Sequence, residues 1–525
     1  MLLKDGIFKK NDEVARLMAT MCCAHQVSTT ITFVPEPITR HESLERLAMT
    51  TPTFTSLFKA MRLHQQPHAN DFNCRRPFDE TARVQLECES DLFGCAFNPY
   101  AGPEDNQLVA IAGADGLHVY NIPLNINRIE HVSGCTFEKF TNTEDKKEEL
   151  YTVAWAYDTF EANNHRNPYK LVTGGAGSKV YVIDFGSNEI DNHLLSFGGE
   201  INEIRTSPSN SNIVATACSD HSVRIHHIRN QSPLITCGGY GNHLDAVLSV
   251  DWHFEGNYIV SCGKDHRILK WDLSVDPAKS WMEKTCAELA KGERNVFFQG
   301  ANVEDTPIVN GLNSPNLNPE ENVGQQVVTA QQTPKNNHLE ILTPVAICDD
   351  LHSDFIDCIR MLPGSDMFAS KGSGNDPTIK ISVFGLPKRL EVRKGDVLEP
   401  EKATTTSRWM TNPSGEAWFT KFVMDPRRRW TACAGCTGEV FFFDGNEEDE
   451  IKQHEVESEI RIKFSNIVRH VDYSPCGRLL VGCTDNGLIF RIDRISADVE
   501  MEKLKAFRFA WDNPNFPENR VNLRS

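Results

Sequence analysis

A strand-like segment that recurs seven times is the feature of this chain that most constrains its fold. The copies begin at Leu92, Leu150, Ile201, Val247, Phe355, Trp418 and Ile467. Each copy is followed by an apolar run, a turn rich in Gly, Asp and Asn, and a further strand-like run, as in SDHSVRIHHI and KDHRILKWDL. The turn residues Asp220 and Asp265 lie one period apart, within the roughly 40–45 residues that a WD-type propeller blade occupies. Seven such units predict seven blades.

The predicted fold class is therefore all-β, a seven-bladed WD-repeat β-propeller with an N-terminal extension and a long disordered insert between blades four and five. We expect the propeller at residues 81–495, a partly disordered extension at 1–80 and a C-terminal tail at 496–525. The insert, about 300–338, is rich in Asn, Gln, Pro and Glu and poor in large apolar residues, a composition typical of disorder. A helix is expected from Ala278 to about Arg294.

One further strand is predicted before the first repeat. Apolar residues alternate with polar ones at Val84, Leu86 and Cys88. The last repeat runs out of strands near Asp493, so we expect the early strand to complete that blade and close the ring. Closure removes the exposed sheet edges that would otherwise aggregate.

Charge and composition narrow the range of functions. The chain has 525 residues and a net charge of −18, which disfavours strong direct nucleic-acid binding because that needs a basic face. The charge suits basic partners such as histone tails, although acidity is also a common route to solubility. The first residues carry charges where a signal peptide needs an apolar core, and no segment is long enough to cross a membrane. Reduced cysteines indicate the cytosol or nucleus.

Two motifs resemble functional sites but have simpler explanations. Cys433 and Cys436 form a lone CxxC, and no second pair or suitably spaced histidine follows to complete a zinc site. We therefore expect no metal and no cofactor. The run Arg427-Arg428-Arg429 follows the first strand of blade six and is interpreted as a solvated basic turn, since one triplet makes few phosphate contacts.

Blade four contains a constellation that could be mistaken for a hydrolytic triad. The spacing of His243, Ser261, Asp265 and Trp271 matches instead the structural tetrad of WD repeats, in which buried polar groups satisfy one another. The chain has no GxSxG, no Walker GxxxxGK[ST] and no HExxH. No catalytic residue is predicted.

Aromatic residues recur at one register of the first strands, and these form the candidate binding site. The second positions of the seven segments are Phe93, Tyr151, Asn202, Leu248, Ile356, Phe419 and Val468. First strands line the axis of a propeller, so these positions form a ring at one mouth of the channel. One such aromatic alone would usually be core packing. Three on one side of the ring, with Trp418 beside them, predict an open cage for a quaternary ammonium group.

At this point the chain resembles the Polycomb WD-repeat family known as extra sex combs or embryonic ectoderm development. The resemblance rests on LFGCAFN, YTVAWAYD, DAVLSVDWHFEGNYIVSCGKDHRILKWDL, DLHSDFIDCIRML, WFTKFVMD and IFRIDR. It covers about Leu92 to Arg494 and does not extend to the extension or the insert.

The resemblance implies a nuclear, noncatalytic subunit of Polycomb repressive complex 2, a histone methyltransferase that represses transcription. It implies a SET-domain catalytic subunit, a trimethylated histone tail and other Polycomb subunits as partners. The family's methyl-lysine cage maps onto Phe93, Tyr151, Trp418 and Phe419, where Phe419 replaces the family's usual Tyr. Arg469 matches an Arg near that cage, with a tail-contacting role and a structural role both open.

Two alternatives remain at this stage. The first is a generic WD-repeat adaptor, such as a ubiquitin-ligase substrate receptor, whose aromatics cluster by chance. The second is a propeller enzyme, for which the sequence supplies no residues. Binding of trimethyl-lysine peptides separates the first alternative from the proposed reader, and turnover by the purified protein would support the second.

Overall fold

The fold was analysed in a computed structural model of the chain. It describes residues 78–86, 90–100, 107–114, 116–136, 148–195, 198–238, 242–294, 338–384, 401–411, 419–427, 429–444, 454–456 and 460–494. These residues belong to one compact unit of the chain. Of the expected N-terminal extension only residues 78–80 are described, and they belong to strand β1 rather than to a disordered segment. Apart from residue 338, the expected insert lies outside the described residues, as does the expected C-terminal tail.

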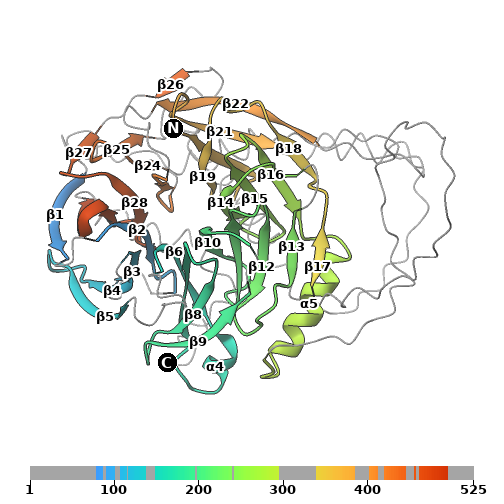
Figure 1. Ribbon diagram of the computed structural model, residues 1–525. Coiled ribbons are helices and arrows are strands. Elements are labelled where there is room, and N and C mark those ends of the chain that lie inside the picture. Colours follow the sequence, from blue (N-terminus) through green and yellow to red (C-terminus); the bar gives the residue numbers. More distant parts are fainter. Residues whose placement is uncertain are drawn as a thin grey trace, which may run out of the picture. The chain divides into compact units, whose positions relative to one another are not determined.

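The strands form a seven-bladed β-propeller (Figure 1). Blades one to three contain β2 (Leu92–Phe97), β3 (Gln107–Gly113), β4 (Gly116–Ile122), β5 (Glu130–Thr136), β6 (Leu150–Tyr157), β7 (Tyr169–Gly175), β8 (Val180–Asp184), β9 (Glu189–Leu194), β10 (Ile201–Thr206), β11 (Ile213–Cys218), β12 (Val223–His227) and β13 (Ile235–Cys237). Neighbouring strands within each of these blades pair in antiparallel fashion. This all-β architecture confirms the fold predicted from the repeats.

The remaining blades follow the same plan with longer connections. Their strands are β14 (Val247–Trp252), β15 (Tyr258–Gly263), β16 (Ile268–Asp272) and β18 (Ala346–Cys348) in blade four, β19 (Ile356–Met361), β20 (Met367–Gly372), β21 (Thr378–Phe384) and β22 (Glu401–Thr411) in blade five, β23 (Phe422–Met424), β24 (Trp430–Ala434), β25 (Glu439–Asp444) and β27 (Ile460–Lys463) in blade six, and β28 (Val468–Tyr473), β29 (Leu479–Thr484) and β30 (Leu488–Arg494) in blade seven. The short η4 (Asp485–Gly487) joins the last two strands.

Three outer pairings add parallel strands to this plan. β17 (Leu339–Ile341) lies beside β13, β18 lies beside β22, and β26 (His454–Val456) lies beside β22. The second of these pairings joins the sheets of blades four and five. Outer strands from distant parts of the chain therefore cover edges that would otherwise be exposed.

The ring is closed by the strand that precedes the first repeat. β1 (Phe78–Gln85) pairs antiparallel with β30, with Val84 opposite Ile489. The strand begins earlier than the alternation suggested, because Phe78 is buried and stacks on Phe442 with ring centroids 4.2 Å apart. It also ends earlier, at Gln85, so that Leu86 lies beyond it and Cys88 lies outside the described residues. A residue that precedes the first repeat thus packs against blade six.

Helices are few among the described residues, and they lie on the outside of the propeller. α5 (Ala278–Leu289) begins where the helix was expected after blade four but ends before Arg294. Trp281 anchors it by donating from its indole nitrogen to the Leu234 carbonyl at 2.9 Å. α4 (Thr159–Asn163) begins after Asp158, whose carboxylate accepts from two backbone amides of the first turn. No helix in the described part of the chain is long and apolar enough to span a membrane.

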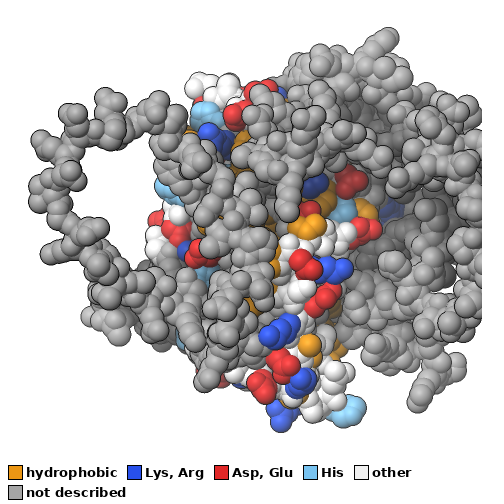
Figure 2. Space-filling model, turned by 90° about the vertical axis from the view of Figure 1, so that its right-hand side faces the viewer, with side chains coloured by type: hydrophobic (Ala, Val, Ile, Leu, Met, Phe, Trp, Pro, Cys, Tyr) orange, Lys and Arg blue, Asp and Glu red, His pale blue; other side chains and the backbone are white. Residues whose placement is uncertain are grey.

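The core lies between adjacent blades. The faces of blades three and four, for example, bury Val250, Ile259 and Trp271 with the apolar residues of β11 to β13. Valine and isoleucine dominate these strands, since β-branched side chains pack well on a pleated surface. On the side that carries α5, the described surface mixes acidic and basic side chains (Figure 2).

The first strand of blade six differs from its prediction. It was expected to start at Trp418, but that residue lies outside the described part of the chain and β23 starts only at Phe422. The reason is the backbone of Phe419, whose φ of 65° is left-handed and incompatible with a regular strand.

Candidate functional site

The first strands of the seven blades form a closed ring around the axis. In ring order they are β2, β6, β10, β14, β19, β23 and β28, and each contacts the next, with β28 returning to β2. Phe93 is the second residue of β2, Tyr151 is the second residue of β6, and Phe419 precedes β23. These elements bring three aromatic residues to one mouth of the ring.

The three rings meet in a compact arrangement that we call the aromatic corner. The centroids of Phe93 and Tyr151 are 5.4 Å apart, those of Tyr151 and Phe419 are 5.7 Å apart, and those of Phe93 and Phe419 are 6.2 Å apart. The ring planes cross at 75°, 69° and 78° in the same order. Three steeply crossed planes resemble the walls at the corner of a box.

The residues at the other four positions of this register are buried within the fold. Leu248, Ile356 and Val468 are buried with 1% or less of their surface exposed. Asn202 is buried too, and its amide donates to the Val247 carbonyl at 2.7 Å and to Ser219 Oγ at 3.0 Å. Phe93 and Tyr151, by contrast, are only partly buried. The accessible aromatic surface is therefore confined to one side of the mouth.

Negative charge surrounds the Tyr151 side of the corner. Burial, followed by the charges of nearby carboxylates, raises the pKa of Tyr151 to about 12; these carboxylates belong to Glu200, Glu149 and Glu148. Glu149 and Glu200 are exposed and immediately precede β6 and β10. A neutral phenol ring beside carboxylates is an environment that favours a bound cation.

Arg469 lies beside Phe93 and is held by an ion pair. Its guanidinium contacts both carboxylate oxygens of Asp485, from Nε at 2.7 Å and from Nη2 at 2.8 Å. The same guanidinium lies 5.9 Å from the Phe93 ring centroid. This bidentate geometry favours the structural role over the tail-contacting role, because it fixes the orientation of the guanidinium.

Below the corner, the axis contains a buried ionic network that sequence reasoning did not identify. Arg360 Nη2 donates to Glu203 Oε1 at 2.7 Å, and Lys421 Nζ lies 3.8 Å from the other oxygen of Glu203. Although burial alone would raise it, these cations hold the pKa of Glu203 well below its usual range. Paired charges of this kind tie blades three, five and six together.

The blade-four residues form a connected hydrogen-bond network. His243 Nδ1 lies 3.0 Å from Asp265 Oδ2, His243 Nε2 lies 2.8 Å from Ser261 Oγ, and Trp271 donates to Ser261 Oγ at 2.9 Å. Asp265 also accepts from the backbone amide of Leu244 at 2.9 Å. Every member has partners within the blade, so the group is arranged to stabilise the blade rather than to pair a nucleophile with a general base.

Blade five repeats part of this network, which the sequence analysis missed. His352 Nε2 lies 2.9 Å from Ser370 Oγ, and its Nδ1 lies 3.3 Å from Asp376 Oδ2. The position that would hold the tryptophan is occupied by Ser382. The spacing of His352, Ser370 and Asp376 equals that of the blade-four residues within a residue or two, and this spacing was the available signal.

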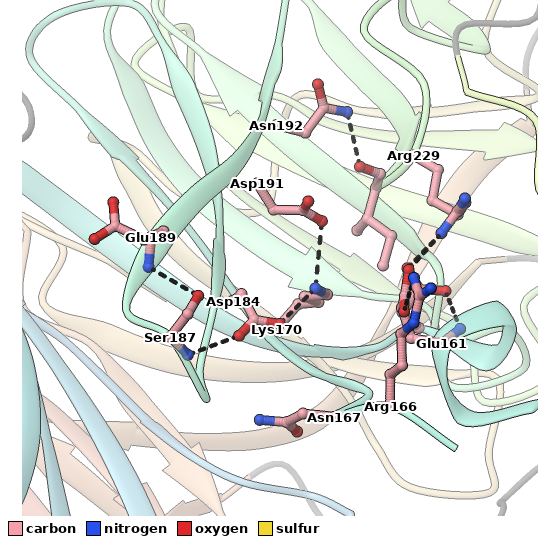
Figure 3. A network of polar contacts seen from close by, with 12 residues as sticks. Glu161, Arg166, Asn167, Lys170, Asp184, Ser187, Glu189, Asp191, Asn192 and Arg229 are labelled. Atoms are coloured by element: carbon pink, nitrogen blue, oxygen red, sulfur yellow. Dashed lines mark hydrogen bonds and ion pairs between the residues drawn. The ribbon is translucent and has the colours of Figure 1, made fainter. Parts of the chain in front are cut away.

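A second polar cluster, drawn in Figure 3, spans blades two and three. Lys170 Nζ lies between two carboxylates, 2.7 Å from Asp184 and 3.3 Å from Asp191. Arg229 lies 3.1 Å from Asp158 and 3.4 Å from Glu161. These cations are already neutralised by the carboxylates around them, which favours a structural role for the cluster.

The two motifs set aside in the sequence are part of blade six. Burial raises the pKa of the Cys433 thiol to about 12, which leaves it a protonated core residue. Arg427 and Arg429 are partly buried rather than fully solvated as expected, because the Arg429 guanidinium lies over the Trp430 ring and Arg427 donates to the Cys476 carbonyl. Arg428 lies outside the described residues.

Comparisons with known proteins agree with this architecture. Residues 232–272 match the family model described as WD domain, G-beta repeat. Polycomb protein mes-6 of Caenorhabditis elegans is 42% identical over 463 residues, which cover 86% of this chain and 99% of that protein. Polycomb protein esc of Drosophila melanogaster is 23% identical over 420 residues, covering 80% and 85% of the two chains.

Solved structures show the same fold. A chain in the crystal structure of the Chaetomium thermophilum polycomb repressive complex 2 covers 80% of this chain and 98% of its own length, with a TM-score of 0.56 at 15% identity. A structure of ctPRC2 in complex with H3K27me3 matches with the same coverage and TM-score. Because the 42% identity to mes-6 extends over 86% of this chain, the chain belongs to the Polycomb WD-repeat family.

Proposed function

We propose that this protein is a noncatalytic scaffold and methyl-lysine reader of a Polycomb-type histone methyltransferase complex in the nucleus. Its cage would consist of Phe93, Tyr151 and Phe419 together with Trp418, and its ligand would be a trimethylated histone tail. Family membership supports the Polycomb role. The aromatic corner, with three crossed rings at one mouth, is the observation that carries the reader role.

The spacing of the three rings suits a cation seated over the corner rather than between the rings. The point equidistant from the three centroids lies only about 3.3 Å from each, closer than the roughly 3.5–4.0 Å at which carbon atoms make contact. A cation about 3 Å above that plane would lie about 4.5 Å from all three centroids, within the roughly 6 Å over which ring faces attract cations.

The chemistry of the corner matches a trimethylammonium group. Such a group has no N–H to donate, so it is recognised by shape, apolar contact and attraction to ring faces. Tyr151 remains neutral at physiological pH, and the exposed Glu149 and Glu200 add negative potential on its side of the mouth. A lysine-rich histone tail carries the complementary charge.

The scaffold role concerns partners outside this chain. We propose that the propeller binds a SET-domain catalytic subunit and other Polycomb subunits, because relatives with this fold occur in structures of polycomb repressive complex 2. The polar networks of blades four and five are used internally and supply no reaction centre. Affinity purification followed by mass spectrometry is the test, and absence of a SET-domain protein from the purified complex would contradict this role.

Calorimetric titration with trimethylated and unmodified histone-tail peptides tests the reader role. We expect the wild-type protein to prefer the trimethylated peptide. Tyr151→Ala removes one ring face and should weaken binding by about 1–2 kcal/mol, which is roughly tenfold in Kd. The fold should persist, since Tyr151 is only partly buried.

Tyr151→Phe is the matched control, because it keeps the ring and removes only the hydroxyl group. It should bind within about twofold of wild type if attraction to the ring face is the operative interaction. Equal affinity of the wild-type protein for both peptides, or full discrimination by Tyr151→Ala, would reject the reader role and leave the scaffold role.

A further inference from the structure

Phe419 occupies the aromatic corner in a backbone conformation that its own sequence does not favour. Its φ of 65° lies in the left-handed region, where a residue with a Cβ is disfavoured and glycine is the usual occupant. Only 7% of its surface is exposed. A conformation of this kind persists only where surrounding groups impose it, and such residues cluster at binding sites.

The group that imposes it is the carboxylate of Asp357 in β19 of the neighbouring blade. Asp357 Oδ2 accepts from the backbone amide of Phe419 at 2.8 Å and from that of Thr420 at 3.3 Å. Two successive amides that converge on one anion are a typical consequence of a left-handed residue in the chain. The carboxylate therefore stabilises the backbone conformation that directs the Phe419 ring into the corner.

The carboxylate is itself held by a buried lysine. Lys371 Nζ in β20 lies 2.8 Å from Asp357 Oδ1 and 3.0 Å from Oδ2, and both side chains are completely buried. Lys421 adds a second connection, because its ammonium donates to the Asp357 carbonyl at 2.7 Å and lies 5.0 Å from the Phe419 ring centroid. A buried charge pair with these partners has one orientation.

We propose that Asp357, oriented by Lys371, is a positioning residue that presets Phe419 for cation binding and so ties the cage to the core of blade five. This inference rests on the proposed reader function. Preorganisation matters here because a ring that must be ordered at the moment of binding contributes less to affinity. Asp357 acts through Phe419 and makes no contact with the ligand.

Two double variants isolate the hydrogen bonds to the Phe419 backbone. Asp357→Leu with Lys371→Met replaces the buried pair by apolar side chains of similar size, which proteins often tolerate. Asp357→Asn with Lys371→Met is identical except that it retains one oxygen to accept from the backbone amides. The matched control is Asp425→Leu with Arg494→Met, another buried pair at 3.4 Å, located at the far end of β23 from Phe419.

The first readout is discrimination between trimethylated and unmodified peptides. We expect the Leu/Met variant at Asp357 to lose roughly tenfold in affinity for the trimethylated peptide, as for loss of one ring face. The Asn/Met variant and the Asp425 control should stay within about threefold of wild type. Undiminished discrimination by the folded Leu/Met variant would overturn the proposal, because Phe419 would then keep its position without the Asp357 carboxylate.

The second readout needs no ligand. With 4-fluorophenylalanine incorporated at position 419, the fluorine resonance of the Leu/Met variant should shift or broaden, while the Asn/Met variant and the Asp425 control should keep the wild-type spectrum. If the wild-type protein fails to discriminate the peptides, the reader function is wrong, and this spectrum alone decides whether Asp357 positions the ring. An unchanged spectrum in the Leu/Met variant rejects the inference.

Discussion

The network of blade four and the aromatic corner occupy different parts of the propeller, and their interactions end differently. The network lies around β15 and β16, whereas the corner lies at the starts of β2 and β6 and just before β23. In blade four, the polar atoms of His243, Ser261 and Asp265 form hydrogen bonds with one another, with Trp271 and with the turn. In the corner, the rings meet edge to face, and Phe93 and Tyr151 remain partly exposed. A completed network stabilises a blade, whereas partly exposed ring surface can still bind a ligand.

The sharpest way to break this comparison is to damage the blade-four network. Asp265→Ala leaves the buried His243 and the Leu244 amide without their acceptor, so we expect it to reduce the free energy of unfolding by about 3–5 kcal/mol. The affinity of the remaining folded protein for trimethylated peptide should stay unchanged. Chemical denaturation and calorimetric titration measure the two quantities.

A mutant of this kind that bound peptide tenfold more weakly while remaining folded would show that the network and the corner are coupled. A mutant with wild-type stability would show that the network does not stabilise the blade. Ser382 is a suitable control, since it stands at the blade-five position equivalent to Trp271 and its buried hydroxyl makes no hydrogen bond within the described residues.

The repeats predicted where the first strands lie, but not the backbone conformation at the ends of these strands. The segments beginning at Leu92 and Leu150 became strands at those residues, because alternation and β-branched content are local signals. Phe419 instead is left-handed, and the cause is a carboxylate 62 residues earlier in the chain. Nothing near Phe419 in the sequence announces this partner.

The sequence predicted which residues form the candidate site, but not which contacts hold them in place. The register of the repeats was sufficient to bring Phe93, Tyr151 and Phe419 together as candidates. The pairing of Asp357 with Lys371 links consecutive strands, and that of Arg469 with Asp485 links β28 to η4. Asp357 and Arg469 each lie at a register shift near the start of a first strand, which the repeat pattern does not predict. Buried ion pairs have no periodicity of their own, so sequence pattern alone does not reveal them.

Acid offers a second way to separate stability from recognition. Burial, with the charge of Arg224, lowers the pKa of His226 to about 3, whereas an unfolded histidine titrates near 6.5. The unfolded state therefore binds more protons between these values, and stability falls as the pH drops through this window. From pH 7.5 to 5.5 the loss should be about 1.4 kcal/mol for this residue.

Denaturation at the two pH values, in wild type and His226→Leu, measures the effect. His227 has a similarly lowered pKa, about 3, through burial and Arg229, and should contribute a comparable loss that the His226 variant retains. The variant should accordingly lose about 1.4 kcal/mol less than wild type on acidification. Equal losses in the two proteins would mean that His226 is already protonated in the folded state.

Arg469→Lys tests the edge of the aromatic corner, beside Phe93, on a smaller scale. Lysine keeps the charge but cannot form the bidentate contact with Asp485, so we expect a loss of at most about 1 kcal/mol in unfolding free energy. Peptide affinity should change by less than about twofold, because the guanidinium serves the fold. A tenfold loss of affinity at unchanged stability would restore the tail-contacting role.

The smallest expected effect is that of alkaline pH on peptide binding. A trimethylammonium group has no proton to lose, the two phenylalanine rings do not titrate, and the pKa of Tyr151 is raised to about 12. Between pH 7 and 9 the corner and its ligand should keep one charge state, and the Kd measured by calorimetry should vary by less than about twofold. Because a phenolate would attract the cation more strongly, binding should tighten only as the pH approaches the pKa of Tyr151. A marked weakening by pH 9 would mean that some other group, titrating in this range, contacts the ligand, and the aromatic corner would then be an incomplete description of the site.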